Sequence, residues 1–83
     1  MRAEKRAATP EEMAARRALY YAIRADWKRR GVNCTKVADA IAYSDDSVRA
    51  YMKALYHGKR GSRFVAAALA DWMDKGGVSA AER

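Results

Sequence analysis

The positions whose spacing suggests chemistry lie between residues 34 and 63 of this 83-residue sequence. If residues 45–56 form a helix, side chains three and four positions apart share one face of it. An arginine on such a face can hold guanine O6 and N7 with two hydrogen bonds when the helix enters the major groove of DNA. The predicted base-contacting residues are Ser44, Asp46, Arg49, Ala50 and Lys53.

Two adjacent carboxylates, Asp45 and Asp46, are the feature that argues most against a DNA-reading helix, because they repel phosphate. They either complement the positive end of the helix dipole, or one of them accepts a hydrogen bond from cytosine N4. We favour the dipole role for at least one of them. A ladder from Asp45 through Arg49 to Lys53 would only stabilise a solvated helix, and it is compatible with Asp45 orienting Arg49 toward a base.

Hydroxyl and cationic side chains on either side of this segment are the candidates for phosphate contact, namely Thr35, Lys36, Lys59, Arg60, Ser62 and Arg63. The formal net charge is +7 and it is unevenly distributed, since residues 1–31 hold nine basic and four acidic side chains, whereas residues 63–83 hold three of each. Release of counterions on binding to phosphate explains such a gradient. A basic surface that merely aids solubility is the alternative explanation.

Four helices are expected to position these residues. Thr9 with Glu12 forms a capping box that starts a helix running to about Arg30, and Asn33 caps a second helix that ends near Ile41. Ser44 caps a third, and the fourth follows the glycine-containing loop 57–61, from about Ser62 to Lys75. The apolar pattern predicts a core of Leu19, Tyr20, Ile23, Trp27, Val37, Ala38, Ile41, Tyr43, Val48, Tyr51, Met52, Leu55, Tyr56, Phe64 or Val65, Ala68, Leu69, Trp72 and Met73.

Residues 34–53 resemble the helix-turn-helix of lambda repressor-like and Cro-like phage regulators. Apolar residues occupy the fourth, eighth, tenth, fifteenth and eighteenth positions of the motif and a small residue the fifth; these are Val37, Ile41, Tyr43, Val48, Tyr51 and Ala38. One departure is Ala42, where the family usually has glycine with positive φ. The resemblance implies an all-α, four-helix bundle, with a possible short fifth helical turn at residues 79–82, that contains this motif.

The same resemblance implies a small phage or mobile-element repressor that binds double-stranded DNA as a homodimer, with the third helix of each copy in the major groove. A protein-interaction module, such as a phage inhibitor or adaptor, is the alternative favoured by the acidic pair and by the many aromatic residues. Single-stranded RNA or DNA binding is a third, weaker possibility, because no aromatic residues are clearly interleaved with the basic face.

We expect a flexible basic arm at residues 1–8, a helix-turn-helix domain at 9–76 and a tail at 77–83. The sequence offers neither a signal peptide nor an apolar run long enough to span a membrane, which favours a cytoplasmic, nucleoid-associated protein. A single cysteine, Cys34, and a single histidine, His57, make a disulfide, a metal site and an enzyme improbable. No cofactor or small-molecule ligand is expected. A helix start at Cys34 would lower the pKa of its thiol and permit redox sensing, although a plain small residue is the simpler interpretation.

Overall fold

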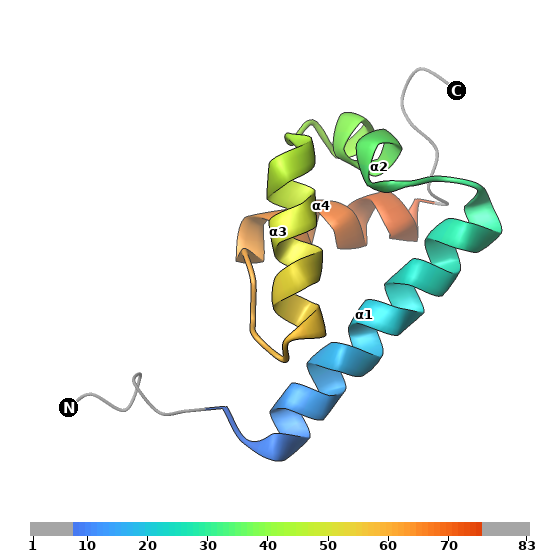
Figure 1. Cartoon of the computed structure of the whole chain (residues 1–83). Coiled ribbons are helices and arrows are strands. Elements are labelled where there is room, and N and C mark those ends of the chain that lie inside the picture. Colours follow the sequence, from blue (N-terminus) through green and yellow to red (C-terminus); the bar gives the residue numbers. More distant parts are fainter. Residues whose placement is uncertain (1–7, 76–83) are drawn as a thin grey trace.

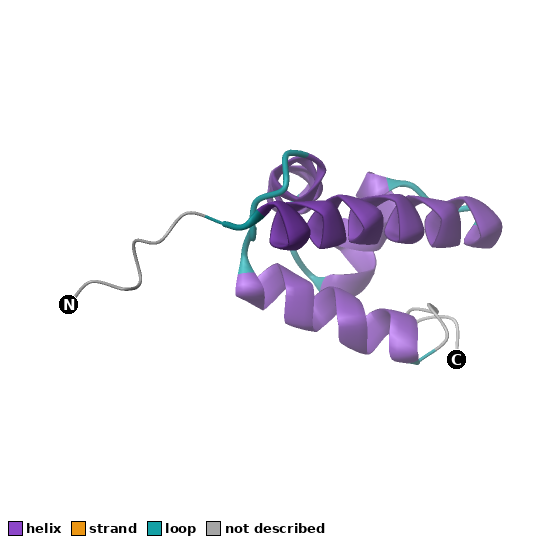
Figure 2. Ribbon diagram, turned by 90° about the horizontal axis from the view of Figure 1, so that it is seen from below, coloured by secondary structure: helices purple, strands orange, loops and turns teal. Residues whose placement is uncertain are grey.

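A computed structural model describes residues 8–75, which form four α-helices and no strand. The helices are α1 (Pro10–Arg30), α2 (Cys34–Ile41), α3 (Asp45–Tyr56) and α4 (Arg63–Asp74). The long helix α1 runs diagonally beside α3, while α2 lies across the start of α3 and α4 passes behind it (Figure 1). Seen from below, α1 and α3 lie on one side of the molecule and α4 on the other (Figure 2). The predicted all-α class is confirmed; the turn expected at residues 79–82, and nearly all of the expected arm, lie outside the described residues.

Each helix begins at the cap that the sequence predicts. The Glu12 amide donates to Thr9 Oγ1 at 3.1 Å, and the Thr9 amide donates to Glu12 Oε1 at 2.8 Å, which completes the capping box. Asn33 accepts from the amide of Lys36 at 2.9 Å and so caps α2. Ser44 caps α3 and Ser62 caps α4 in the same way. These side chains satisfy amide groups that a helix leaves without partners in its first turn.

The turn between α2 and α3 is built on Ala42, whose φ of 63° and ψ of 42° place it in the left-handed region. Elsewhere in residues 8–75, only glycines have positive φ. The amide of Tyr43 then donates to the carbonyl of Ala38 at 2.9 Å, which closes the end of α2. The backbone therefore adopts the conformation that a glycine would favour, at the cost of strain on the Cβ of an alanine.

The core lies where all four helices meet, and α3 contributes most of it. Its fully or nearly buried apolar residues are Ile23, Trp27, Val37, Ala38, Val48, Tyr51, Met52, Leu55, Val65, Leu69 and Trp72. Ala38 is only 1% exposed, so a small side chain stands where α2 packs most tightly. Tyr20, Ile41 and Met73 pack against this core and are partly buried.

Four expected core residues are wrong. Leu19 is 45% exposed because steps of four residues drift by about 40° around a helix, and Tyr20 takes the inward position beside Ile23 instead. At the start of α4, Val65 is buried and Phe64 is 63% exposed. Tyr43 and Tyr56 lie at the surface, at the start and end of the segment that contains α3. The expectation that some aromatic surface stays exposed is confirmed.

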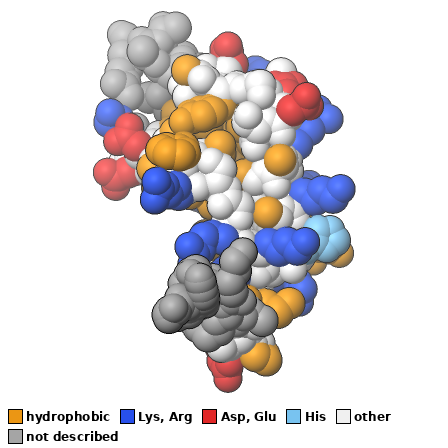
Figure 3. All heavy atoms as spheres, turned by 90° about the vertical axis from the view of Figure 1, so that its left-hand side faces the viewer, with side chains coloured by type: hydrophobic (Ala, Val, Ile, Leu, Met, Phe, Trp, Pro, Cys, Tyr) orange, Lys and Arg blue, Asp and Glu red, His pale blue; other side chains and the backbone are white. Residues whose placement is uncertain are grey.

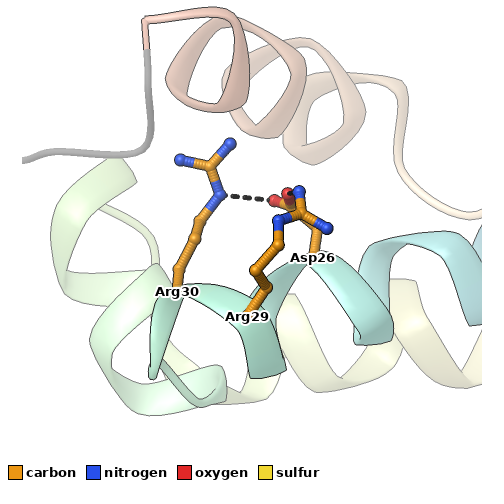
Figure 4. A network of polar contacts seen from close by, with 3 residues as sticks. All are labelled: Asp26, Arg29 and Arg30. Atoms are coloured by element: carbon orange, nitrogen blue, oxygen red, sulfur yellow. Dashed lines mark hydrogen bonds and ion pairs between the residues drawn. The ribbon is translucent and has the colours of Figure 1, made fainter.

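A buried carboxylate near the end of α1 is a feature that the sequence pattern did not indicate. Asp26 is 6% exposed and accepts hydrogen bonds from Arg29 and Arg30, the latter through Nε at 2.6 Å (Figure 4). The Arg30 guanidinium carbon also lies 5.6 Å from the ring centroid of Trp72 on α4. The last turn of α1 is thereby connected to α4 through charge-assisted and cation–π contacts.

Candidate nucleic-acid interface

The exposed side of α3 carries the predicted base-contacting residues. Asp46, Arg49, Ala50 and Lys53 are all exposed, and Ser44 is exposed at the cap that precedes them. The buried residues of the same helix lie on the opposite side, so one amphipathic helix presents a polar face outward. The structure therefore brings these five positions onto one surface, which we call the α3 face.

The two acidic residues at the start of α3 have different surroundings. Asp45 accepts a hydrogen bond from the hydroxyl of Thr35 on α2 at 2.9 Å, and Arg49 Nη2 lies 4.0 Å from the same carboxylate oxygen. Asp46 is exposed and has no hydrogen bond or ion pair with another residue of the range 8–75. Because an exposed pair at 4.0 Å contributes little stability, the main effect of Asp45 is on the direction of the Arg49 guanidinium, which stays 65% exposed.

The predicted phosphate-contacting residues are also exposed, and they form two groups. Thr35 and Lys36 lie at the start of α2, while the second group, Lys59, Arg60, Ser62 and Arg63, lies in and just after the loop between α3 and α4. α2 begins on one side of α3 and that loop runs along the other side (Figure 1). The two groups therefore flank the α3 face and do not form one continuous cluster.

The loop between α3 and α4 is fastened to α1. Arg16 Nη1 donates to the carbonyl of Gly58 at 3.1 Å, and Arg17 Nε donates to the carbonyl of Tyr56 at 3.0 Å. These arginines occupy carbonyls at the C-terminal end of α3, so their role in this structure is to position the loop. Lys59 and Arg60 are thereby presented from a backbone that is held in place.

Lys and Arg side chains are spread over the side of the molecule that holds this loop (Figure 3). Hydrophobic side chains form a patch among them (Figure 3). Tyr43, 38% exposed, and Phe64 line a hollow of about 460 Å³ between α3 and the start of α4, together with Ala50 and Ser62. Two of the predicted DNA-contacting positions therefore border an apolar surface.

Cys34 does not have the activated thiol that its place at the start of α2 suggested. Burial raises the pKa of this thiol, and the smaller effects of the Arg49 and Arg24 charges, which lower it, do not overcome that rise. The expectation of a dipole-lowered pKa is wrong, because desolvation of the thiolate outweighs the favourable charges around it. The structure thus gives no support to redox sensing at Cys34.

Comparisons of this chain with protein-family models, with curated proteins and with solved structures find no match. Within the described range, no three His, Cys, Asp or Glu side chains are grouped so as to hold a metal ion. None of the four helices is long and apolar enough to cross a membrane. The functional argument therefore depends on the geometry of the chain itself.

Proposed function

We propose that this protein is a sequence-specific double-stranded DNA-binding transcription regulator, a small repressor of the phage or mobile-element type. In this proposal α2 and α3 form a helix-turn-helix, and α3 enters the major groove. The observation that carries the proposal is the exposed α3 face, with Arg49 projecting from it and hydroxyl and cationic groups on both of its sides. A protein that inserts a helix into a groove needs that distribution, because phosphates line both edges of the groove.

The local geometry between α2 and α3 supports the motif. Val37 and Val48 are fully buried, Ala38 is nearly so, and the turn between them passes through a left-handed residue at Ala42. A helix-turn-helix needs this combination of a small residue at the contact and a sharp turn, since two short helices must pack together at close range. The exposed Tyr43 is the one motif position that lacks the expected burial.

Each part of the interface has a proposed role. Arg49 contacts a guanine through two hydrogen bonds, and Asp45 limits the directions that its guanidinium can take. Thr35 and Lys36 contact phosphates on one side of the groove, and Lys59, Arg60 and Arg63 contact phosphates on the other. A homodimer places two copies of α3 about one helical turn of DNA apart, and the bound protein then blocks or recruits polymerase.

Substitution of Arg49 and of Lys59 separates base recognition from positioning. Arg49→Ala should cost about 1–3 kcal/mol on the preferred site and relax base choice at one position per half-site, because a bidentate contact is lost. Lys59→Ala should weaken binding to all sequences equally and flatten the slope of log K against log salt by about 0.9 per contact removed. Fluorescence anisotropy over a salt series, with both variants checked for folding by circular dichroism, measures both effects.

A protein-interaction module is the second candidate function, and the exposed Tyr43 and Phe64 beside the 460 Å³ hollow favour it. An apolar patch next to the α3 face suits a protein partner better than it suits a phosphate backbone. If Arg49→Ala leaves both affinity and base preference unchanged, α3 does not contact bases, and this second function becomes the better explanation of the α3 face.

A further inference from the structure

An open groove of about 940 Å³ lies between α1 and α3 and reaches the start of α2. Its floor is largely apolar and includes Trp27 and Met52. Four cationic side chains line it, two from each long wall: Arg24 and Lys28 from α1, and Arg49 and Lys53 from α3. No acidic side chain is among the lining residues. We call this feature the α1–α3 groove.

The end of the groove adds further groups that favour an anion. Asn33 and Thr35 line it at the start of α2, whose first turn contains no acidic residue, in contrast to the first turns of α1 and α3. Helix N-termini carry a partial positive charge and amide donors that attract anions. The dipole of α2 is therefore not offset by a carboxylate in its own first turn, although the hydroxyl of Thr35 is shared with Asp45.

The charges on the two walls act at the same place. Arg24 and Arg49 both lower the pKa of the Cys34 thiol, and Cys34 itself lines the groove, so positive charge from α1 and from α3 converges beside it. Arg24 is held by Tyr20, whose hydroxyl accepts from Nη1 at 2.9 Å. Lys28 is exposed, and its ammonium has no hydrogen bond or ion pair with any other residue between 8 and 75. Cations collected without a carboxylate repel one another, and a bound anion relieves that repulsion.

We propose that the α1–α3 groove binds phosphate groups of the DNA backbone, and that Arg24 and Lys28 are phosphate-contacting residues. This inference rests on the proposed function, because a strand that passes Thr35 at the edge of the major groove lies at the mouth of this groove. The basic track on that side of α3 then includes α1 as well as the start of α2. A phosphorylated small molecule offers the same chemistry, and the experiment below distinguishes it from a DNA strand.

Lys28→Gln, with Lys75→Gln as the matched control, tests the proposal. Both variants lose one positive charge at an exposed position, but Lys75 lies after α4 and pairs with Asp71 at 3.2 Å. Lys28→Gln should weaken binding to preferred and random duplexes alike by about eightfold at roughly 0.1 M salt, since one phosphate contact carries a slope of about 0.9. Arg24→Gln should have a similar effect, whereas Lys75→Gln should bind within about twofold of the parent.

Alkylation of Cys34, the single cysteine of the chain, reports directly on whether the groove is covered. Saturating duplex DNA should slow the reaction of Cys34 with N-ethylmaleimide severalfold, because the strand covers the groove and adds negative charge near the thiol. Inorganic phosphate and adenosine 5′-monophosphate at the same phosphate concentration should protect it far less.

The proposal is overturned if Lys28→Gln binds DNA like Lys75→Gln, or if saturating duplex leaves the alkylation rate unchanged. It is also overturned if the mononucleotide protects Cys34 as well as the duplex does, since the groove would then be a small-molecule site. A failure of the proposed function looks different, because the parent protein would then not bind duplex DNA at all.

Discussion

Asp26 shows how one residue connects the DNA-binding surface to the rest of the fold. Its carboxylate is buried at the end of α1, accepts from Arg29 and Arg30, and places the Arg30 guanidinium near Trp72 of α4. The same stretch of α1 carries Lys28 into the α1–α3 groove. The position of a groove cation therefore depends on a buried polar network that makes no contact with the proposed DNA surface.

Asp26→Ala should lower the free energy of unfolding by about 1–3 kcal/mol, because it leaves the partly buried Arg30 without a carboxylate partner. In a domain of this size the melting temperature should fall by about 4–8 °C for each kcal/mol lost. Thermal unfolding followed by circular dichroism measures the shift. The exposed Asp74 supplies the control, and equal melting temperatures for Asp26→Ala and Asp74→Ala would contradict the assigned role.

At the scale of the elements, the turns carry strain in one place and avoid it in another. Ala42 has a φ of 63° although it is not glycine, while Gly61 has a φ of 73° and lies so close to Tyr51 that a Cβ there would be 2.8 Å from Cδ1. Ala42 precedes α3 and Gly61 precedes α4, so the two positions set the directions in which these helices leave the turns.

Substitutions at these two positions should change stability in opposite directions. Ala42→Gly should stabilise the protein by about 0.5–1 kcal/mol, because it removes left-handed strain that exceeds the entropy cost of a glycine. Gly61→Ala should destabilise it by about 1–3 kcal/mol through strain and the contact with the Tyr51 ring. Urea unfolding of both variants checks the signs. A loss of stability in Ala42→Gly would show that the left-handed alanine is not strained.

The helix boundaries could be predicted from the sequence because capping is local. Thr9, Asn33, Ser44 and Ser62 each satisfy amides two or three residues away, so the residues concerned are neighbours in the sequence. Long-range facts were not accessible in this way. The exposure of Leu19 and the burial of Cys34 depend on which helix packs opposite them, and periodicity does not give that information.

The candidate site divides along the same line. The α3 face was predictable because its residues repeat with helical spacing on a single element. Arg24 and Lys28 were missed because they enter the basic surface only when α1 and α3 come together around the groove. Asp45 was expected to orient Arg49, but its hydrogen bond with Thr35 depends on the packing of α2 against α3.

At the scale of the whole molecule, the exposed apolar side chains suggest a contact with a second copy. Phe64 on α4 is 63% exposed, and Leu19 and Tyr21 on α1 are 45% and 55% exposed. One short helix contacts only a few base pairs, so a specific site needs two copies. We propose α4, with the aromatic side chains near it, as the dimer surface and the N-terminal part of α1 as the alternative.

Analytical ultracentrifugation at micromolar concentration should show a homodimer for the parent protein. Phe64→Lys should shift the protein toward monomer, because a buried charge at the interface is costly, whereas Leu19→Lys should leave the dimer intact. The reverse pattern would move the interface to α1. A parent protein that stays monomeric both with and without duplex DNA would contradict dimerisation altogether.

Selection of duplexes from a random-sequence pool, followed by sequencing of the retained molecules, tests the central claim most directly. If α3 contacts bases as a homodimer, the retained pool should be enriched in a palindrome whose half-sites lie about one helical turn apart. Each half-site should contain a guanine whose enrichment disappears when the selection is repeated with Arg49→Ala. Retention without any enriched sequence, or no retention even at low salt, would contradict sequence-specific DNA binding by this protein.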